Sequence, residues 1–402
     1  MGTALMESVA AEWIELNAFP HHRVGRIGVE LEFLVEDHEI PRDRVNLTRL
    51  RRALDSPGAL PAGGSVSFEP GGQVELSTRP AGAVAACVSE AAADLSVLRD
   101  RAGRDGLRLR GAGLDERPPA RTVDLAWYAA LERSYDLFGP WGRVMMCNAA
   151  AVQVSLDLGD DSTGWRGRNR RWLLANRLGP VLVAMFANSP DLFGLRARST
   201  RQLIRFRTDP TRTDPVPWSG DVRADWTRYL LDARIVGIQG NTPSEWTAPP
   251  VGLTLRRWLR DARPRAVYEG DLRRHLKSMI PPVRACGRME LRMIDAQHGD
   301  DWVVPVVVAA YLLDDERGFA QAETATRPLP VPTRGDYLLA AREGLSVPRL
   351  ADVAARCMRS VLRGLDGLAL PDWAAARVCS FADRYTLRGV SPADLCLVTE
   401  GP

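Results

Sequence analysis

Four short segments of the sequence alternate polar and apolar side chains, and three of them carry glutamates on the polar side. Residues 28–34 read G-V-E-L-E-F-L, residues 73–77 read Q-V-E-L-S, residues 152–157 read V-Q-V-S-L-D and residues 289–293 read M-E-L-R-M. Side chains point alternately to the two faces of a strand, so each segment predicts a strand with one polar and one aliphatic face. A single segment of this kind is more often an ordinary half-exposed strand; only the four together indicate a site.

The glutamates of these segments could form one cation-binding site. Neighbouring strands lie about 5 Å apart, so several polar faces can converge on one small volume. Carboxylates gathered there would raise one another's pKa unless a cation neutralised them. Oxygen ligands of this kind select Mg²⁺ or Mn²⁺ rather than zinc, and the same cations neutralise nucleotide phosphates. The predicted metal ligands are Glu30, Glu32, Glu69, Glu75 and Glu290.

A sharp turn is expected immediately before the second segment. Residues 67–72 read S-F-E-P-G-G, and Glu69 opens the turn. Proline restricts φ to a value that suits turns, and glycine adopts positive φ without a Cβ penalty. Glu69 therefore belongs to the same motif as Glu75, but it lies at a turn and not within a strand.

The overall composition is that of an ordinary globular protein, and it excludes several classes. Hydrophobic residues make up 45% and charged residues 26% of the chain, which is typical of a soluble fold. A net charge of +3 is too small to argue for nucleic-acid binding. Lys277 is the only lysine, which excludes a Walker-type phosphate loop, because that loop requires a lysine after its second glycine. Any ATP must therefore be held in another way.

Cysteine usage and hydropathy indicate a cytoplasmic protein that does not cross a membrane. The six cysteines are scattered without a C-x-x-C pair, and no signal peptide is in view, so reduced thiols are expected. No run approaches 18 consecutive apolar residues, so no transmembrane helix is predicted. The expected partners are small molecules, with no nucleic acid and no membrane, and the protein is expected to be a monomer or homodimer.

Helices are expected to hold the four strands in place. The spacing of apolar residues predicts helices over residues 5–16, 81–103, 128–139, 165–186 and 302–313. The last of these is apolar throughout, which is typical of a buried helix.

The remaining segments are expected to be less regular. Residues 145–157 read as one strand, residues 196–217 as an irregular arginine-rich loop, and residues 320–333 as a proline-bearing connection. Residues 336–390 read as two or three helices. We expect a single catalytic domain over residues 1–402, whose C-terminal part is helical from about residue 336.

Several motifs resemble those of the glutamate–cysteine ligase family. They occur in the same order over roughly residues 25–395, and the closest resemblance is to the bacterial members that serve ergothioneine biosynthesis. The motifs are E-x-E at Glu30 and Glu32, E-P-G-G-Q-x-E-L-S from Glu69 to Ser77, Met145-Met146-Cys147 leading into V-Q-V-x-L-D, F-A-N-S-P from Phe186 to Pro190, His275-Leu276, and P-P-V-R followed by E-L-R-M-I-D-A-Q from Pro281 to Gln297.

The resemblance implies both a fold and an activity. The fold is similar to that of glutamine synthetase and related ligases, an α+β architecture with a curved, mostly antiparallel β-sheet, metals on its concave face and helices packed outside. The implied reaction joins the γ-carboxylate of L-glutamate to the amine of L-cysteine through a γ-glutamyl phosphate. Mg²⁺ (or Mn²⁺) is the implied cofactor, and ATP is the co-substrate.

The resemblance also implies roles for individual side chains. Gln153 matches a family position near the metals and is added to the predicted metal site, where its amide would ligate weakly or orient a carboxylate. Arg292 would lie near the transferred phosphate, where a guanidinium suits two oxygens. Arg212 is expected to be a second catalytic arginine. A simpler interpretation is a salt bridge for Arg292 and a solvated basic loop around Arg212. The predicted substrate-binding residues are Arg201, Arg205, Gln73 and Ser155.

Four positions depart from the family pattern and leave the acceptor open. Ser155 stands where asparagine is common, and Arg205 stands where the family usually places tryptophan. Lys277 and Ser278 replace threonines that are common after the His-Leu pair. One alternative is therefore a ligase of the same chemistry that uses another amine or acid. A second alternative is a regulatory or binding protein with the ligase fold and no turnover.

Overall fold

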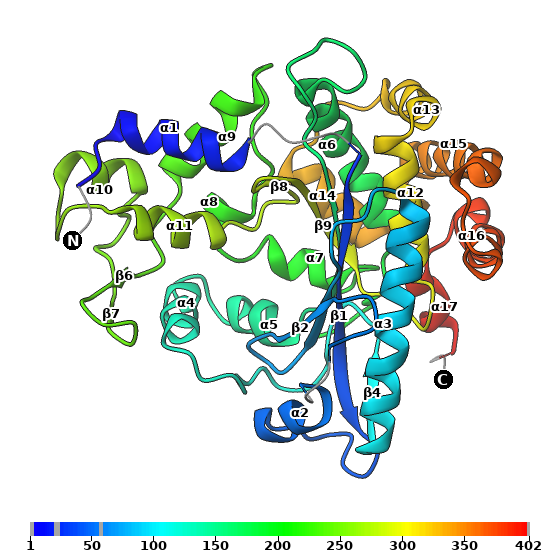
Figure 1. The fold of residues 1–402 in the computed structure, drawn as a ribbon, viewed down its shortest axis with the longest axis horizontal. Helices are drawn as coiled ribbons and strands as arrows, with labels where there is room; N and C mark the ends of the chain where they lie inside the picture. The colour runs from blue at the N-terminus through cyan, green and yellow to red at the C-terminus, as the bar shows by residue number, and fades with distance from the viewer. Residues whose placement is uncertain (1–3, 20–24, 56–58, 400–402) are drawn as a thin grey trace.

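Strand β1 (Ile27–Asp37) runs through the centre of a seven-stranded antiparallel sheet in the computed structural model (Figure 1), which describes residues 4–19, 25–55 and 59–399. The strands follow the order β2-β3-β1-β5-β9-β8, and β4 pairs with the far end of β1. The other strands are β2 (Ser65–Phe68), β3 (Val74–Ser77), β4 (Leu107–Arg110), β5 (Ala151–Leu156), β8 (Val283–Ala285) and β9 (Met289–Asp295).

The four segments with alternating side chains are neighbours in this sheet, as the expected convergence of their polar faces requires. Strand β1 lies between β3 and β5, and β5 pairs with β9. The register places Glu32 opposite Glu75, Glu30 opposite Gln153, and Ser155 opposite Glu290. Because residues opposite each other in a sheet point to the same face, the polar side chains share one face and the aliphatic ones share the other.

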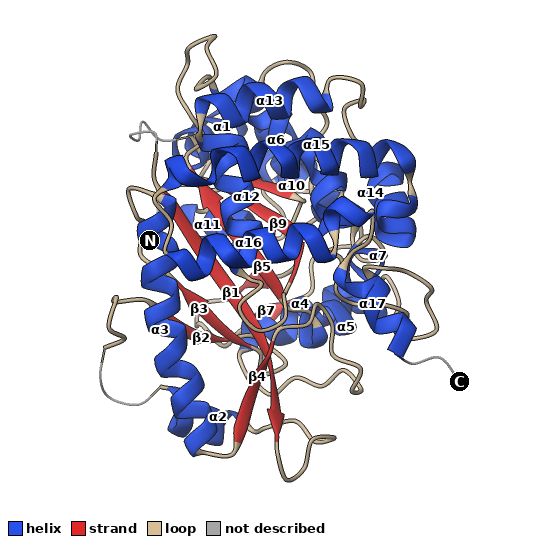
Figure 2. Cartoon of the chain, turned by 90° about the vertical axis from the view of Figure 1, so that its right-hand side faces the viewer, coloured by secondary structure: helices blue, strands red, loops and turns tan. Residues whose placement is uncertain are grey.

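The aliphatic face of the sheet is buried under helices. Helix α3 (Val84–Arg104) packs on β1, α12 (Val303–Asp314) on β5, and α6 (Arg168–Met185) on β9. Figure 2 shows α3 and α12 on the near side of the strands. All residues from Val303 to Leu313 are buried, which explains why this helix is apolar on every side. A second helical layer follows, made of α13 (Glu316–Thr326), α15 (Pro348–Gly364) and α16 (Asp372–Arg384).

Four shorter helices surround the polar face on the other side of the sheet (Figure 1). They are α4 (Ala126–Asp136), α5 (Trp141–Asn148), α7 (Thr200–Arg205) and α11 (Glu269–Lys277). The remaining elements are α1 (Glu7–Ala18), α2 (Leu47–Leu54), α8 (Pro210–Thr213), α9 (Val222–Asp232), α10 (Leu255–Asp261), α14 (Arg334–Glu343), α17 (Pro392–Thr399), the hairpin of β6 (Ile238–Gln239) and β7 (Trp246–Thr247), and three 3₁₀ turns at Gly344–Ser346, Leu365–Leu368 and Thr386–Arg388. None of the helices in the described ranges has both the length and the apolarity needed to cross a bilayer.

Three expectations about local structure were wrong, and helix caps explain two of them. Residues 145–147 belong to helix α5, and the chain becomes extended only after Asn148. The segment 196–217 contains helices α7 and α8, because the Ser199 and Asp209 side chains accept hydrogen bonds from the backbone of their first turns. Helix α13 extends into the predicted connection at 320–333, and its N-terminus is capped by Asp315.

Candidate active site

A cavity of about 590 Å³ opens on the polar face of the sheet. The sheet and the turn before β3 contribute Glu30, Glu32, Glu69, Gln73, Glu75, Gln153 and Arg292 to its lining. The helices α4, α5, α7 and α11 form the opposite walls and contribute Trp127, Tyr128, Leu131, Tyr135, Met145, Met146, Arg201, Arg205 and Lys277. Four glutamates therefore share this cavity with several cationic side chains.

Glu290 is the most strongly neutralised carboxylate of the site. It is completely buried, it accepts a hydrogen bond of 2.9 Å from Arg284 Nη2, and it lies 2.6 Å from Arg292 Nη1. Arg288 Nη2 lies 3.2 Å from the same carboxylate. Burial raises the pKa of Glu290, but these arginines outweigh burial and hold its pKa at about 2. Glu290 is therefore an anion that the protein itself has paired.

The glutamates on the other side of the cavity have raised pKa values. Burial first, and then the charges of Glu69 and Glu75, raise the pKa of Glu32 to about 8. Burial and Glu75 likewise raise the pKa of Glu69 to about 7, and burial, Glu290 and Glu75 raise the pKa of Glu30. Buried carboxylates that repel one another favour a proton or a cation.

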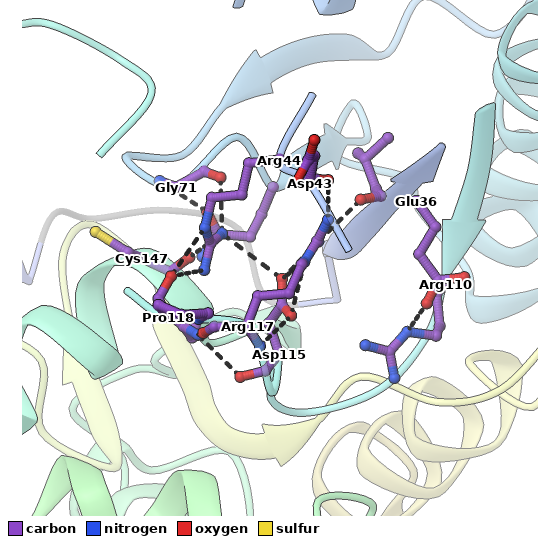
Figure 3. A network of polar contacts seen from close by, with 12 residues as sticks. Glu36, Asp43, Arg44, Gly71, Arg110, Asp115, Arg117, Pro118 and Cys147 are labelled. Carbon is purple, nitrogen blue, oxygen red and sulfur yellow. Dashed lines mark hydrogen bonds and ion pairs between the residues drawn. The ribbon is translucent and has the colours of Figure 1, made fainter. Parts of the chain in front are cut away.

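Backbone contacts hold the turn that carries Glu69 in place (Figure 3). A Cβ atom on Gly71 would lie 1.9 Å from the carbonyl oxygen of Cys147, and Gly72 has a φ of 86°, so both glycines are required here. Arg44 Nη1 donates to the carbonyl oxygens of Gly71 at 3.2 Å and Cys147 at 3.1 Å. The turn before β3 is thus fastened to the end of α5.

A second cavity, of about 610 Å³, meets the first at Glu30. Its lining includes Gly28, Ser77, Thr78, Pro80, Ser155, Leu156 and Arg288. Arg288 lines the second cavity, and its guanidinium bonds Ser155 Oγ at 2.8 Å and Glu30, the residue shared by both cavities, at 3.0 Å.

Comparison with known proteins identifies the family. The model of glutamate–cysteine ligase family 2 (GCS2) matches residues 26–400. The chain belongs to the glutamate–cysteine ligase family. The glutamate–cysteine ligase EgtA of Mycobacterium tuberculosis is 35% identical over 96% of this chain and 89% of its own length. The EgtA of Mycolicibacterium smegmatis is also 35% identical, over 87% of this chain and 82% of its own length.

Solved structures support the fold. The crystal structure of the glutamate–cysteine ligase of Francisella tularensis in complex with AMP matches with a TM-score of 0.52 and 13% sequence identity, covering 92% of this chain and 84% of that one. The expected α+β fold, with a mostly antiparallel sheet and helices packed outside it, is confirmed.

Most of the predicted site residues line one cavity, but four do not take the expected place in it. Glu290, a predicted metal ligand, is absent from the lining and is paired with arginines. Arg212 does not line the cavity; it is completely buried and bonds Asp209 at 2.9 Å and Ser278 Oγ at 2.8 Å. Ser155 lies in the second cavity. The amide of Gln73 borders the main cavity, but it bonds the Gly71 amide and the Ala149 carbonyl, which stabilises the turn.

Three cationic residues of the site were not predicted as functional. Arg284 stands opposite Glu290 in the β8–β9 hairpin, and the alternation of V-R-A before a short glycine turn was a signal that could have revealed it. Arg288 lies inside that turn, where no periodicity applies. Lys277, noted only as a departure from the family pattern, lies at the exposed end of α11 and lines the main cavity.

The donor set of the main cavity fits a divalent cation. Glu30, Glu32, Glu69 and Glu75 supply hard oxygen atoms. Burial and the neighbouring carboxylates raise the pKa of Glu30, Glu32 and Glu69. As they stand, no three or more acidic, histidine or cysteine side chains in the described part of the chain are placed so that they could hold a metal ion together. The fit therefore lies in the chemistry of the donor atoms and not in a preformed geometry. The arginines around Glu290 neutralise the other side of the cavity.

Proposed function

We propose that this chain is an ATP-dependent ligase that joins the γ-carboxylate of L-glutamate to the amine of L-cysteine, releasing ADP and phosphate. The observation that carries the proposal is the single cavity in which glutamates from β1 and β3 face arginines from α7, β8 and β9. The relatives named EgtA support the same activity, and with it a supply of γ-glutamylcysteine for ergothioneine biosynthesis. We further propose that the enzyme is cytoplasmic and acts as a monomer or homodimer.

The chemistry requires an activated acid. A free carboxylate is a poor acylating agent because oxide is a poor leaving group. Transfer of the γ-phosphoryl group of ATP to the γ-carboxylate of glutamate gives γ-glutamyl phosphate and ADP. The amine of cysteine then attacks the acyl carbon, phosphate leaves with the former carboxylate oxygen, and the nitrogen loses a proton to give the amide.

Arg292 is suited to assist the phosphoryl transfer. Its Nη1 atom bonds Gln153 Oε1 and lies 2.6 Å from Glu290, so its guanidinium is fixed on the wall of the cavity. Burial lowers the pKa of Arg292, but Glu290 outweighs burial and raises it above the usual range, so the group stays charged. A fixed cation stabilises charge that develops on the transferred group without reorganising during the reaction.

A divalent cation and the nucleotide have separate proposed positions. We assign Mg²⁺ or Mn²⁺ to Glu30, Glu32, Glu69 and Glu75, with Gln153 and Glu290 adjoining. When bound, the cation supplies positive charge to the phosphate oxygens. The second cavity, with Ile27, Leu156 and Pro80 in its lining and Glu30 at its junction with the first, suits the nucleoside of ATP.

Arg205 favours a second candidate, a ligase of the same chemistry with a different amine or acid. It lines the main cavity at a position where the resemblance leads us to expect a flat apolar side chain. A charged wall there would change which substrate fits.

The test is ADP release by the purified protein with Mg-ATP and L-glutamate, with and without L-cysteine and with a panel of other amines. Strong stimulation by cysteine, with γ-glutamylcysteine detected by mass spectrometry, supports the proposal. Preference for another amine supports the second candidate.

Glu75→Gln should lower ADP release at least about a hundredfold, whereas the matched control Glu12→Gln, at an exposed position on α1, should leave it unchanged. Full turnover in the Glu75 variant would overturn the metal assignment.

A further inference from the structure

Arg205 is a deeply buried cation on the wall of the main cavity. The residue is 1% exposed. Its Nη1 atom donates to the Arg292 carbonyl oxygen at 3.0 Å, and its Nη2 atom donates to the Ile280 carbonyl oxygen. Its Nε atom has no hydrogen-bond partner. Both partners are therefore neutral carbonyl groups, and they use only two of the five N–H groups of the guanidinium.

No carboxylate in the described residues pairs with Arg205, which distinguishes it from comparable arginines. Arg171, Arg201 and Arg212 are buried to the same degree, and they pair with Asp314, Asp295 and Asp209, respectively. The groups nearest to Arg205 include two more cations, Arg201 and Arg292. Burial and these two cations lower the pKa of Arg205 well below its usual range. A buried charge without a counter-ion destabilises the folded state. Arg205 therefore lowers the free energy of unfolding when no substrate is bound.

The distribution of charge in the cavity indicates what would neutralise Arg205. The β1 and β3 side of the cavity carries the glutamates to which the cation is assigned, whereas the α7 and α11 side carries Arg201, Arg205 and Lys277. Asp295 already neutralises Arg201. A planar guanidinium with unused donor capacity matches a carboxylate. Both amino acids of the proposed reaction carry an α-carboxylate that the reaction does not consume.

We propose that Arg205 binds the α-carboxylate of an amino-acid substrate and thereby selects amino acids over their decarboxylated analogues. The proposal rests on the proposed function, because it places the substrates of that reaction in this cavity. It makes Arg205 a specificity-determining residue, whose counter-ion arrives with the substrate.

The experiment compares each amino acid with the analogue that lacks only the α-carboxylate. L-cysteine is compared with cysteamine as acceptor, and L-glutamate is compared with 4-aminobutyrate as the acid. The ratio of kcat/KM within each pair is measured for the wild type, Arg205→Met, Arg205→Lys and the control Arg207→Met. Arg207 lies two residues further along the chain, with its guanidinium over the Trp141 ring, and it does not line the cavity.

In one of the two pairs, Arg205→Met should lower the kcat/KM ratio of the amino acid to its analogue at least about a hundredfold. The reason is that the wild-type site rejects the analogue strongly, because the analogue leaves the charge of Arg205 unpaired. Arg205→Lys should restore part of the preference, and Arg207→Met should leave both ratios unchanged. The pair that responds identifies whether glutamate or the acceptor supplies the carboxylate. Each ratio is independent of the fraction of correctly folded enzyme, so a poorly folding variant still gives a valid result. Unchanged ratios in both pairs would overturn the proposal.

The same four compounds separate this proposal from the proposed function. If the wild type turns over neither pair, the proposed function fails, and Arg205 is then tested by calorimetric binding of the four compounds to the wild type and to Arg205→Met. Binding that needs both the α-carboxylate and Arg205 would support the carboxylate site. Binding that is equal for each compound and its analogue, or that survives Arg205→Met, would overturn it.

Discussion

Glu32 on β1 and Glu75 on β3 lie directly opposite each other in the antiparallel register. Like charges at such a position destabilise a sheet, and Glu69 adds a third carboxylate that raises the pKa of Glu32. The sheet nevertheless pairs at this point, with Ser67 and Ser77 donating hydrogen bonds to Glu75 at 3.0 and 3.1 Å. This arrangement supports the proposal that the carboxylates bind a cation, and their mutual repulsion has measurable consequences.

Stability without divalent cations should fall as the pH rises from about 5 to about 8. The pKa of Glu32 is raised from 4.5 to about 8, so the folded state binds a proton that the unfolded state releases within this window. The corresponding stabilisation is complete below the unfolded pKa and is lost as the pH passes the folded pKa. Thermal unfolding in EDTA should reveal a loss on the order of 3 kcal/mol.

Two comparisons check that this pH dependence belongs to the glutamate cluster. Glu32→Gln should make the curve between pH 5 and 8 shallower, with Glu69 supplying the remaining slope, whereas Glu12→Gln should leave it unchanged. Millimolar Mg²⁺ or Mn²⁺ should raise the Tm of the wild type at pH 8, because a ligand that binds only the folded state stabilises it. A Tm at pH 8 that is insensitive to both cations would contradict the metal site.

Loss of Arg292 should impair the chemical step more than nucleotide binding. Replacing Arg292 by Gln removes a charge on the cavity wall, while Arg284 and Arg288 still neutralise Glu290. We expect kcat to fall about 10²- to 10³-fold, with a much smaller change in the affinity for ATP measured by calorimetry. The matched control is Arg317→Gln, which replaces an exposed arginine on α13. Equal losses in kcat and ATP affinity would assign Arg292 to ground-state binding.

The turn before β3 should tolerate no side chain at Gly71. A Cβ there would collide with the Cys147 backbone at 1.9 Å, so the turn or α5 must move and Glu69 must move with it. Gly71→Ala should destabilise the protein by about 2–4 kcal/mol and reduce activity. Gly82→Ala is the control, since a Cβ at Gly82 meets nothing within 4 Å. A Gly71→Ala enzyme as stable and active as the control would show that the close approach does not matter.

Lys277 provides a direct reporter of cavity occupancy. It is the only lysine of the sequence, it is exposed, and it lines the main cavity. Reductive methylation should modify one lysine, identified by peptide mass spectrometry. Mg-ATP with L-glutamate should slow the modification several-fold, because bound substrates cover the cavity wall. A rate of modification that does not respond to substrates would place their binding elsewhere.

Several features of this protein could be predicted from the sequence because they depend only on residues that are close together in the chain. Alternation with a period of two revealed the strands of Glu30, Glu75 and Glu290 and the shared face of each. The Pro-Gly-Gly step revealed the turn of Glu69, since it depends on backbone conformations that few residues adopt. The motifs that resemble the glutamate–cysteine ligases led to the family and its fold.

The helical content of the segment 196–217 was hidden because its arginines suggested solvent exposure. Arg201, Arg205 and Arg212 are buried instead, and the short helices depend on the Ser199 and Asp209 caps. A guanidinium can be buried when distant groups accept its hydrogen bonds, and the positions of those groups cannot be read from the neighbouring sequence.

Only the tertiary structure decided which charges of the site are paired. Glu290 pairs with Arg284 because β8 and β9 form a hairpin, and Arg201 pairs with Asp295, which is 94 residues further along the chain. Arg205, four residues from Arg201, pairs with no carboxylate in the described structure. The sequence determined which residue types could do the chemistry. Electrostatic pairing acts over a few ångströms in space, so only the folded arrangement of β8, β9 and α7 decided which cation is left for a substrate.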